Sequence, residues 1–336
     1  MKVNKTFVND IFNDEMRSGY LVTSHKKKLW NVQLGLINEF ARVCKKYDIK
    51  WFAFFGTLLG AARHKGFIPW DDDVDLMMLR PDFEKFKKVA ETEIKQPYFL
   101  DLFYNYRRES DEVLNIKSEE NLPLITLEYE NKWILGSAIA KLKDSRTTMI
   151  EPQNLDMDDF NHGIYIDIFP FDPLPPFSND QQIINHQLSK ELLVATIYPN
   201  LIRNAINNGQ QTIFPADMLQ QVINLPYRQR GIIFEDFLTK NFTKSDYVGM
   251  LTHSPINAPT KDWERTYETK YLEEVDYLPF ENIQIPVPAN YDEILTHIYG
   301  DWREPILSHI HVMDYSADIP FEQYIKAKQN IKIQSI

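Results

Sequence analysis

The fold of this chain is decided by residues 54–79, which read FFGTLLGAARHKGFIPWDDDVDLMML. Four aspartates occupy the five positions from Asp71 to Asp75, and an apolar run from Leu76 to Leu79 follows them. Carboxylates this close repel one another and shift one another's pKa unless a cation lies among them. The apolar run indicates a buried strand, so the aspartates stand at the start of that strand. A divalent cation is the group best suited to neutralise them.

The alternation of side chains along an extended chain decides which aspartates can act together. Asp71, Asp73 and Asp75 face one way, whereas Asp72 faces the other. Because Mg²⁺ takes few carboxylates together with waters and phosphate oxygens, Asp73 and Asp75 are the predicted metal ligands. Asp71 is in phase with them and is predicted to orient the acceptor or a water. Asp72 is predicted to cap the backbone or to pair with a nearby cation.

The segment before the aspartates changes the interpretation of the acidic run. Residues 50–55 are typical of a buried strand, Gly56-Thr57 of a tight turn and residues 58–63 of a short helix. An isolated acidic run is more often a solvated turn. Here the order of strand, Gly-Thr turn, helix and strand with Asp-x-Asp is similar to the active-site layout of nucleotidyltransferases. An EF-hand loop is excluded, because its glycine and its closing glutamate are missing.

The chain also resembles the LicD family of phosphocholine transferases, to which fukutin-type phosphoribitol transferases are related. The matching segments are Phe55–Gly60, Arg63, Lys65–Trp70, Asp71–Asp75, Ala140–Asp144, Tyr165–Asp172 and residues 291–301. The resemblance therefore extends over about residues 25–305. Residues 178–275 carry no matching motif, so the resemblance defines the reaction better than it defines the acceptor.

The resemblance implies an α+β fold, in which helices flank a nucleotidyltransferase-like mixed sheet. It implies transfer of a phospho-alcohol, phosphocholine in the first place, from a CDP-linked donor to a glycan hydroxyl, with Mg²⁺ or Mn²⁺ as cofactor. The acceptor would be a cell-surface glycan or its lipid-linked precursor, as in lipopolysaccharide or teichoic acid. Ribitol or glycerol phosphate transfer, or true nucleotidyl transfer, would use the same cluster. A non-catalytic nucleotide-binding module of the same fold is the alternative from another class.

Asp167 is the predicted third metal ligand, on a different strand from the acidic run. It stands between Ile166 and Ile168, and an acidic residue inside an apolar strand indicates a functional role. An outward-facing position on a half-exposed strand is the alternative, and the resemblance argues against it. The predicted catalytic carboxylates are Asp71, Asp73, Asp75 and Asp167.

Several residues around the cluster are predicted to bind the donor. The predicted substrate-binding residues are Gly56, Thr57, Arg63, His64, Lys65, Trp70 and Lys141. The Gly-Thr turn would let backbone and hydroxyl approach a phosphate. Arg63 and Lys141 would offset the charge of the diphosphate, and the bidentate fork of Arg63 makes it the stronger candidate in its segment. Trp70 either closes the core over the strand or cages a quaternary ammonium by cation–π contact.

Composition restricts the classes of protein to consider. The chain has 336 residues with 43% hydrophobic and 13% aromatic content, which is typical of a globular protein. A net charge of −11 argues against nucleic acid as a partner. The single cysteine, Cys44, excludes an intramolecular disulfide and is predicted to be a buried thiol. Because no signal-like or membrane-spanning apolar run is visible, we expect a cytoplasmic protein, which could meet the inner face of the membrane through its acceptor.

The remaining patterns predict a catalytic core over 1–177, a helical subdomain over 178–275 and a C-terminal segment over 276–336 that packs back on the core. The predicted helices are 27–48, 80–94, 181–207 with an interruption at Tyr198-Pro199, 216–241 and 292–299. The predicted strands are 98–104, 124–129, 133–142, 163–169 and a final segment at 278–285, with a loop at 155–162. The proline-rich run 170–176 is predicted to end the sheet as a stiff connector. His309 and His311 could bind a metal, but a surface pair is the favoured interpretation.

Overall fold

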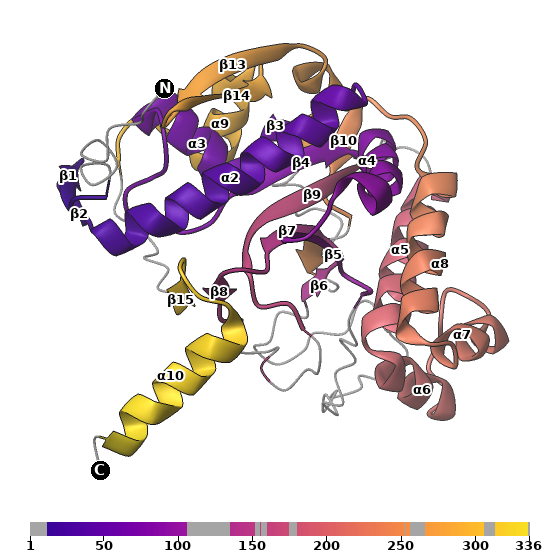
Figure 1. Ribbon diagram of the computed structural model, residues 1–336. Coiled ribbons are helices and arrows are strands. Elements are labelled where there is room, and N and C mark those ends of the chain that lie inside the picture. Colours follow the sequence, from indigo (N-terminus) through magenta and orange to yellow (C-terminus); the bar gives the residue numbers. More distant parts are fainter. Residues whose placement is uncertain are drawn as a thin grey trace.

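A mixed sheet organises the chain, and helices pack around it (Figure 1). The computed structural model describes residues 12–105, 135–151, 155, 160–174, 180–251, 253–255, 266–305 and 313–334. The strands are β1 (Glu15–Arg17), β2 (Tyr20–Val22), β3 (Phe52–Ala53), β4 (Asp75–Leu79), β5 (Tyr98–Leu102), β6 (Leu135–Ser137), β7 (Ala140–Asp144), β8 (Thr148–Met149), β9 (Ile164–Leu174), β10 (Tyr247–Gly249), β11 (His253–Pro255), β12 (Thr266–Glu268), β13 (Val275–Phe280), β14 (Ile283–Pro288) and β15 (Tyr315–Ser316). The helices are α2 (Ser24–Lys46), α3 (Phe55–Leu59), the π-helix η1 (Gly60–His64), α4 (Arg80–Glu93), α5 (Asp180–Ile197), α6 (Pro199–Asn207), α7 (Ala216–Ile223), α8 (Tyr227–Asn241), the 3-10 helix η4 (Thr269–Leu272), α9 (Tyr291–Tyr299) and α10 (Phe321–Gln334).

The long strand β9 is the centre of the seven-stranded sheet. On one side it runs parallel to β4, and β4 pairs in turn with β3. On its other side, residues 164–168 pair with β7, which continues to β5, and residues 172–174 pair with β10, which continues to β12. The α+β prediction is therefore confirmed, and β9 joins the acidic strand β4 to the strands β7, β5, β10 and β12.

The proline-rich run does not end the sheet as predicted, because β9 continues through it to Leu174. Backbone N–H groups point alternately to the two sides of a strand, and that of Asp167 bonds Val74 on the β4 side. Pro170 therefore lacks its N–H on the other side, in the gap between the pairing with β7 and the pairing with β10. Pro173 lacks its N–H on the β4 side, beyond the last pair with β4 at Phe171. Neither proline costs a ladder bond, so the strand tolerates both.

The core around the sheet depends on α2 and α4, which both pack against β9. Phe40 of α2 and Phe86 of α4 meet with ring centroids 4.8 Å apart. Thr23 caps the start of α2, where its hydroxyl accepts a hydrogen bond from the Lys26 N–H. Cys44 is buried as predicted, and burial raises the pKa of its thiol, so it is an inert core residue.

A second apolar core belongs to α5, α6, α7 and α8, which stand together beside the sheet (Figure 1). It confirms the predicted helical addition, and the break at Tyr198-Pro199 separates α5 from α6. A further break, not predicted, divides residues 216–241 because Pro226 caps a new helix, α8. The chain then returns to the sheet as β10 and β12 before residue 275.

Two other segments differ from their predictions. The final segment is not one strand but the β13–β14 hairpin, because the chain reverses at Glu281, which has a φ of 51°. Residues 135–144 form two strands, β6 and β7, with the latter in the main sheet. The predicted strand 124–129, His309, His311 and much of the loop 155–162 lie outside the described residues.

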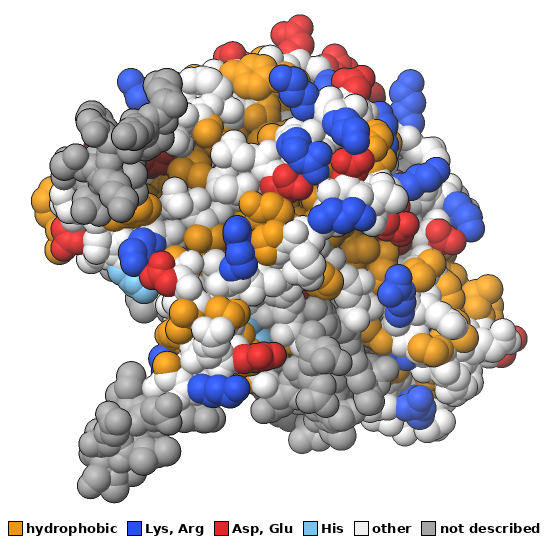
Figure 2. Space-filling model, in the orientation of Figure 1, with side chains coloured by type: hydrophobic (Ala, Val, Ile, Leu, Met, Phe, Trp, Pro, Cys, Tyr) orange, Lys and Arg blue, Asp and Glu red, His pale blue; other side chains and the backbone are white. Residues whose placement is uncertain are grey.

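The surface seen in Figure 2 carries lysines and arginines interspersed with aspartates and glutamates. No large patch of one sign gathers on that face, so the net charge of −11 is not concentrated there. Among the described residues, no helix is both long enough and apolar enough to span a bilayer.

Candidate active site

A row of charged residues crosses four neighbouring strands of the sheet. Asp101 of β5 is the register partner of Lys141 on β7, Lys141 is the partner of Asp167 on β9, and Asp167 is the partner of Asp75 on β4. Register partners on adjacent strands share one face of a sheet, with strands about 4.8 Å apart. The prediction that Asp167 lies on the same face as Asp75 is therefore confirmed.

Gly56 and Thr57 lie in the first turn of the helix α3 and not in the predicted tight turn before a helix. This Gly-Thr turn holds Asp75 in place. The Thr57 hydroxyl accepts a hydrogen bond from the Asp75 N–H at 2.8 Å, and the Gly56 N–H bonds the Asp75 carboxylate. Thr57 is buried, so its hydroxyl positions the strand and does not lie open to a ligand. A Cβ on residue 56 would lie 2.9 Å from Asp71 Oδ2 and 3.8 Å from Asp75 Oδ2. A larger residue at position 56 would therefore displace the Asp71 carboxylate, whereas glycine lets it approach the backbone.

The acidic segment begins pairing later than predicted, because β4 starts at Asp75 and not at Asp71. Asp72 points away from the other acids, as the phase predicted. Its carboxylate accepts the Met313 N–H at 3.2 Å, and its carbonyl accepts the Gln33 amide at 2.8 Å. Asp72 therefore acts as a buried anchor for the chain on either side of the cluster.

The pKa values of Asp73 and Asp75 are raised by burial and by the charges of their acidic neighbours. Burial, followed by Asp75, Asp71 and Asp167, raises the pKa of Asp73 to about 10. Burial and the charges of Asp167 and Asp71 raise the pKa of Asp75 well above its usual value. The cluster is therefore strained when it is ionised, and a cation among these carboxylates would relieve it.

The donor set suits a sparsely ligated cation better than a complete protein cage. Across the described ranges, no group of three or more His, Cys, Asp or Glu side chains is arranged to hold a metal ion. Two carboxylates such as Asp73 and Asp75, completed by waters and substrate phosphate, fit the preference of Mg²⁺. The ligand set of Asp73, Asp75 and Asp167 stays a prediction, because Asp167 is already in an ion pair.

That ion pair joins Asp167 Oδ1 to Lys141 Nζ at 2.9 Å. Burial would lower the pKa of Lys141, but the charges of Asp167 and Glu151 raise it above its usual value. The same ammonium lies 3.5 Å from Glu151 Oε1 and 3.5 Å from the centroid of the Tyr165 ring. Lys141 is therefore a charged, buried lysine next to the acidic cluster.

Arg63, His64 and Lys65 lie at the end of the π-helix η1, where they have different surroundings. Arg63 donates to the Trp302 carbonyl at 2.8 Å and to His64 Nε2 at 2.9 Å, so its guanidinium ties down the chain after α9. Burial and the Arg63 charge lower the pKa of His64 to about 4, so the imidazole is neutral. Lys65 is exposed and takes a left-handed conformation with φ of 55°. Their contact with a phosphate stays a prediction.

Trp70 fits the core interpretation better than the cage interpretation. Its side chain is buried, and its ring packs edge-on against Tyr20 at 6.2 Å and His64 at 5.8 Å between centroids. A cage for a quaternary ammonium needs exposed ring faces, which this buried tryptophan does not offer.

Sequence reasoning missed two residues of the charged row, Asp101 and Glu151, which both pair with Lys143. In the sequence Lys143 ranks below Lys141 as a candidate, and Tyr299 lies in the matching segment 291–301. Burial and the charges of Asp75 and Asp71 raise the pKa of the Tyr299 phenol. No local pattern points to Asp101 or Glu151, because their partners lie on other strands.

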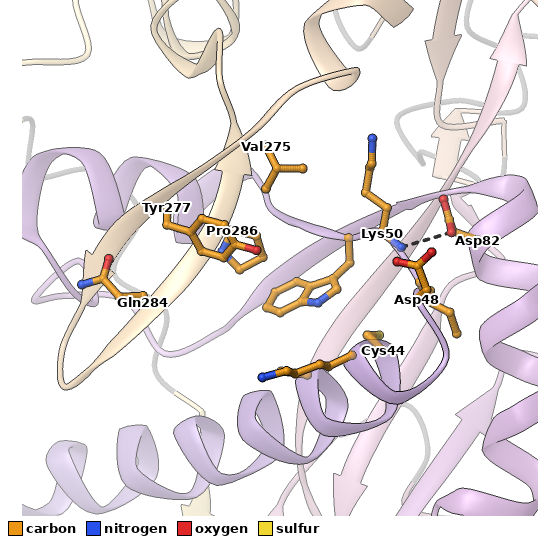
Figure 3. Close-up of a pocket in the computed structure, with 12 residues that line it drawn as sticks. Cys44, Asp48, Lys50, Asp82, Val275, Tyr277, Gln284 and Pro286 are labelled. Carbon is orange, nitrogen blue, oxygen red and sulfur yellow. Dashed lines mark hydrogen bonds between the residues drawn. The ribbon is translucent and has the colours of Figure 1, made fainter.

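A separate pocket lies away from this face, between the end of α2 and the β13–β14 hairpin (Figure 3). Its volume is about 680 Å³, and Tyr277, Gln284 and Pro286 of the hairpin lie across from Cys44 and Asp48. It adjoins the start of β3, whereas the Gly-Thr turn follows the end of β3. None of the predicted site residues lines it, so the pocket and the charged face are distinct features.

Parts of this chain are similar to known proteins. Residues 48–129 match the family described as LicD/FKTN/FKRP, nucleotidyltransferase domain. The lipopolysaccharide cholinephosphotransferase LicD of Haemophilus influenzae is 28% identical over 275 residues, which are 81% of this chain and 89% of that protein. Uncharacterized proteins of Rickettsia typhi and Rickettsia prowazekii are 36% and 40% identical over 84 and 70 residues, and each match covers 25% of the relative. The matched residues include the Gly-Thr turn and the acidic strand, so the part of the chain that carries the charged face is similar to the LicD/FKTN/FKRP nucleotidyltransferase domain.

Proposed function

We propose that this chain transfers phosphocholine from a CDP-linked donor to a hydroxyl of a lipopolysaccharide-type glycan. The observation that supports this most strongly is the strained cluster of Asp71, Asp73 and Asp75 beside the charged Lys141. Such a face suits a diphosphate bound through a cation and a lysine. The choice of phosphocholine follows the named activity of the Haemophilus influenzae relative.

In this proposal the chain's own residues bind and orient the reactants on a nucleotidyltransferase-like core. Asp73 and Asp75 would hold Mg²⁺ or Mn²⁺, and the bound ion would neutralise charge on the diphosphate. Lys141 and Arg63 would contact the donor phosphates, and Asp71 would accept the proton of the attacking hydroxyl. The hydroxyl oxygen forms a bond to the phosphorus that carries choline, the bond from that phosphorus to the CMP oxygen breaks, and CMP leaves.

The helical addition, α5 to α8, is our candidate for acceptor selection. The residues with chemical roles lie on β4 and the segment before it, on β7 and on η1, whereas the helices form a second apolar core together with a few residues beside them such as Phe103 and Leu174. A lipid-linked acceptor would bring the protein to the inner face of the membrane. Exchange of residues 180–241 for those of a relative should change the preferred acceptor and leave donor hydrolysis intact. A loss of donor affinity with unchanged acceptor preference would refute this division.

The activity is tested by CMP release from CDP-choline, CDP-ribitol and CDP-glycerol, with Mg²⁺ and with EDTA. We expect release from CDP-choline to exceed the other two, to stop with EDTA, and to be matched by choline transfer to lipopolysaccharide. The variant Asp75→Asn is the control for contaminating hydrolases. Preference for CDP-ribitol or CDP-glycerol would show that the transferred group is ribitol phosphate or glycerol phosphate and not phosphocholine. Binding of donor without release under any condition would instead favour the non-catalytic module.

A further inference from the structure

Lys141 lies between two carboxylates that compete for its ammonium. Its Nζ atom is 2.9 Å from Asp167 Oδ1 and 3.5 Å from Glu151 Oε1. Asp167 is the predicted third ligand of the cation, whereas Glu151 lies on the side of Lys141 that leads away from the acidic cluster, towards Lys143. The lysine can therefore exchange one carboxylate for the other by a change of side-chain torsions, without movement of the backbone.

Glu151 is held in a fixed position to receive this ammonium. Its Oε2 atom is 3.3 Å from Lys143 Nζ, so its two oxygens face two different lysines. Lys143 is itself fixed, because it lies 2.9 Å from Asp101 and donates to the Asn161 carbonyl at 2.8 Å. All the charged groups of this arrangement are buried, where a charge left without a partner is costly.

The Tyr165 ring provides a surface over which the ammonium can move. Its centroid is 3.5 Å from Lys141 Nζ, within the range of a cation–π contact. Burial raises the pKa of the Tyr165 phenol, so the ring stays neutral. The Tyr165 ring can therefore stabilise the Lys141 ammonium whether it contacts Asp167 or Glu151.

We propose that Lys141 exchanges Asp167 for Glu151 when a divalent cation binds the acidic cluster, and that Glu151 is the positioning residue for this exchange. Without the cation, the Lys141 ammonium takes the role of the cation and neutralises Asp167. With the cation, the like charges of ion and ammonium repel, Asp167 becomes available, and Glu151 accepts the lysine. This inference rests on the cation of the proposed function, but it concerns binding and not turnover.

A double-mutant cycle on metal affinity tests the exchange. Mn²⁺ alone is titrated calorimetrically into the wild type, Glu151→Gln, Lys141→Met and the double variant. We expect Glu151→Gln to weaken Mn²⁺ binding about ten-fold, as loss of an outer-shell partner does. In the Lys141→Met background, where no ammonium needs a new partner, the same change should have less than about a two-fold effect.

The alternative is that Glu151 only adds negative charge to the field at the site. It predicts the same weakening by Glu151→Gln in both backgrounds, and that result would overturn the proposal, as would absence of Mn²⁺ binding by the wild type. Near-ultraviolet circular dichroism checks the fold, and Glu151→Asp, which keeps the charge, replaces Glu151→Gln in the cycle if the latter unfolds. Coupled Mn²⁺ binding without release of CMP from CDP-choline would refute the proposed function and leave the exchange standing.

Discussion

Asp167 and Asp172 belong to the same strand, β9, and are both buried, yet their surroundings are opposite in character. They stand five positions apart, so they project from opposite faces of the sheet. Asp172 receives two parallel hydrogen bonds from Arg80, with Nε to Oδ1 at 2.6 Å and Nη2 to Oδ2 at 2.9 Å. Asp167 shares one lysine with Glu151 and faces Asp75.

The difference lies in the balance of charge and not in burial. On the Arg80 face, Glu84 and Glu235 complete a network with Lys87, in which acids and bases alternate. On the Asp167 face Asp71, Asp73 and Asp75 crowd together beside Asp167, and the pKa values of Asp73 and Asp75 rise through burial and through the charges of these neighbours. A satisfied buried network holds α4 and α8 to the sheet, whereas an unsatisfied one is prepared for a ligand.

The largest effect is expected at the unsatisfied face. Asp75→Asn should lower kcat/KM for the donor by roughly 10³-fold, because a preorganised charge at the reacting group is lost. Its melting temperature without metal should stay the same or rise, because repulsion with Asp71 and Asp73 decreases. Asp73→Asn should behave in the same way. Steady-state CMP release and a thermal melt measure the two quantities, and near-normal turnover in both variants would refute the assignment.

The same substitution on the other face should have the opposite signature. Asp172→Asn leaves the buried Arg80 guanidinium without its main partner, which typically costs about 3–5 kcal/mol of stability. The activity of the molecules that remain folded should be close to that of the wild type. Urea unfolding gives the change in stability, and a lost activity with unchanged stability would place Asp172 in the site.

A smaller effect is expected from the cations near the cluster. Lys141→Ala and Arg63→Ala should each lower kcat/KM by roughly ten- to a hundred-fold, the loss of a charge-assisted contact of about 1.5–3 kcal/mol. Arg63→Ala should also destabilise the turn after α9, because its guanidinium donates to the Trp302 carbonyl. The exposed Lys270→Ala is the control. Unchanged kinetics in the two site variants would exclude these residues from donor binding.

The smallest effect concerns His162, at the far end of the charged row. Burial and the nearby Lys143 lower the pKa of its imidazole to about 4. A base whose pKa is lowered by folding takes up a proton more readily when unfolded, so stability should fall as the pH drops from about 6.5 towards about 4. His162→Gln should remove this part of the pH dependence, a change of a few degrees in melting temperature between pH 7 and pH 5. Identical pH profiles of the two proteins would contradict the prediction.

The local pattern around residues 54–79 was enough to predict the centre of the site. The in-phase aspartates and the buried strand follow from short-range rules of backbone geometry and side-chain alternation. The predicted tight turn at Gly56-Thr57 is instead the first turn of the helix α3. The helix at the start of the chain and the helical addition follow from periodicity in the same way. The strand β9 was found, but its length was not, because proline is tolerated only where neighbouring strands leave a gap, and the sequence does not show those gaps.

The sequence by itself thus determined which acids crowd together and which turn approaches them. Only the tertiary structure decided their partners: Lys141 for Asp167, Lys143 for Asp101, and Arg80 for Asp172. These pairs join strands or helices that are far apart in the chain. Their register depends on packing of the whole sheet, in which a shift of one residue would move each side chain to the other face. Local sequence patterns can indicate where a charged residue is needed, but only the packing of the tertiary structure brings its oppositely charged partner beside it.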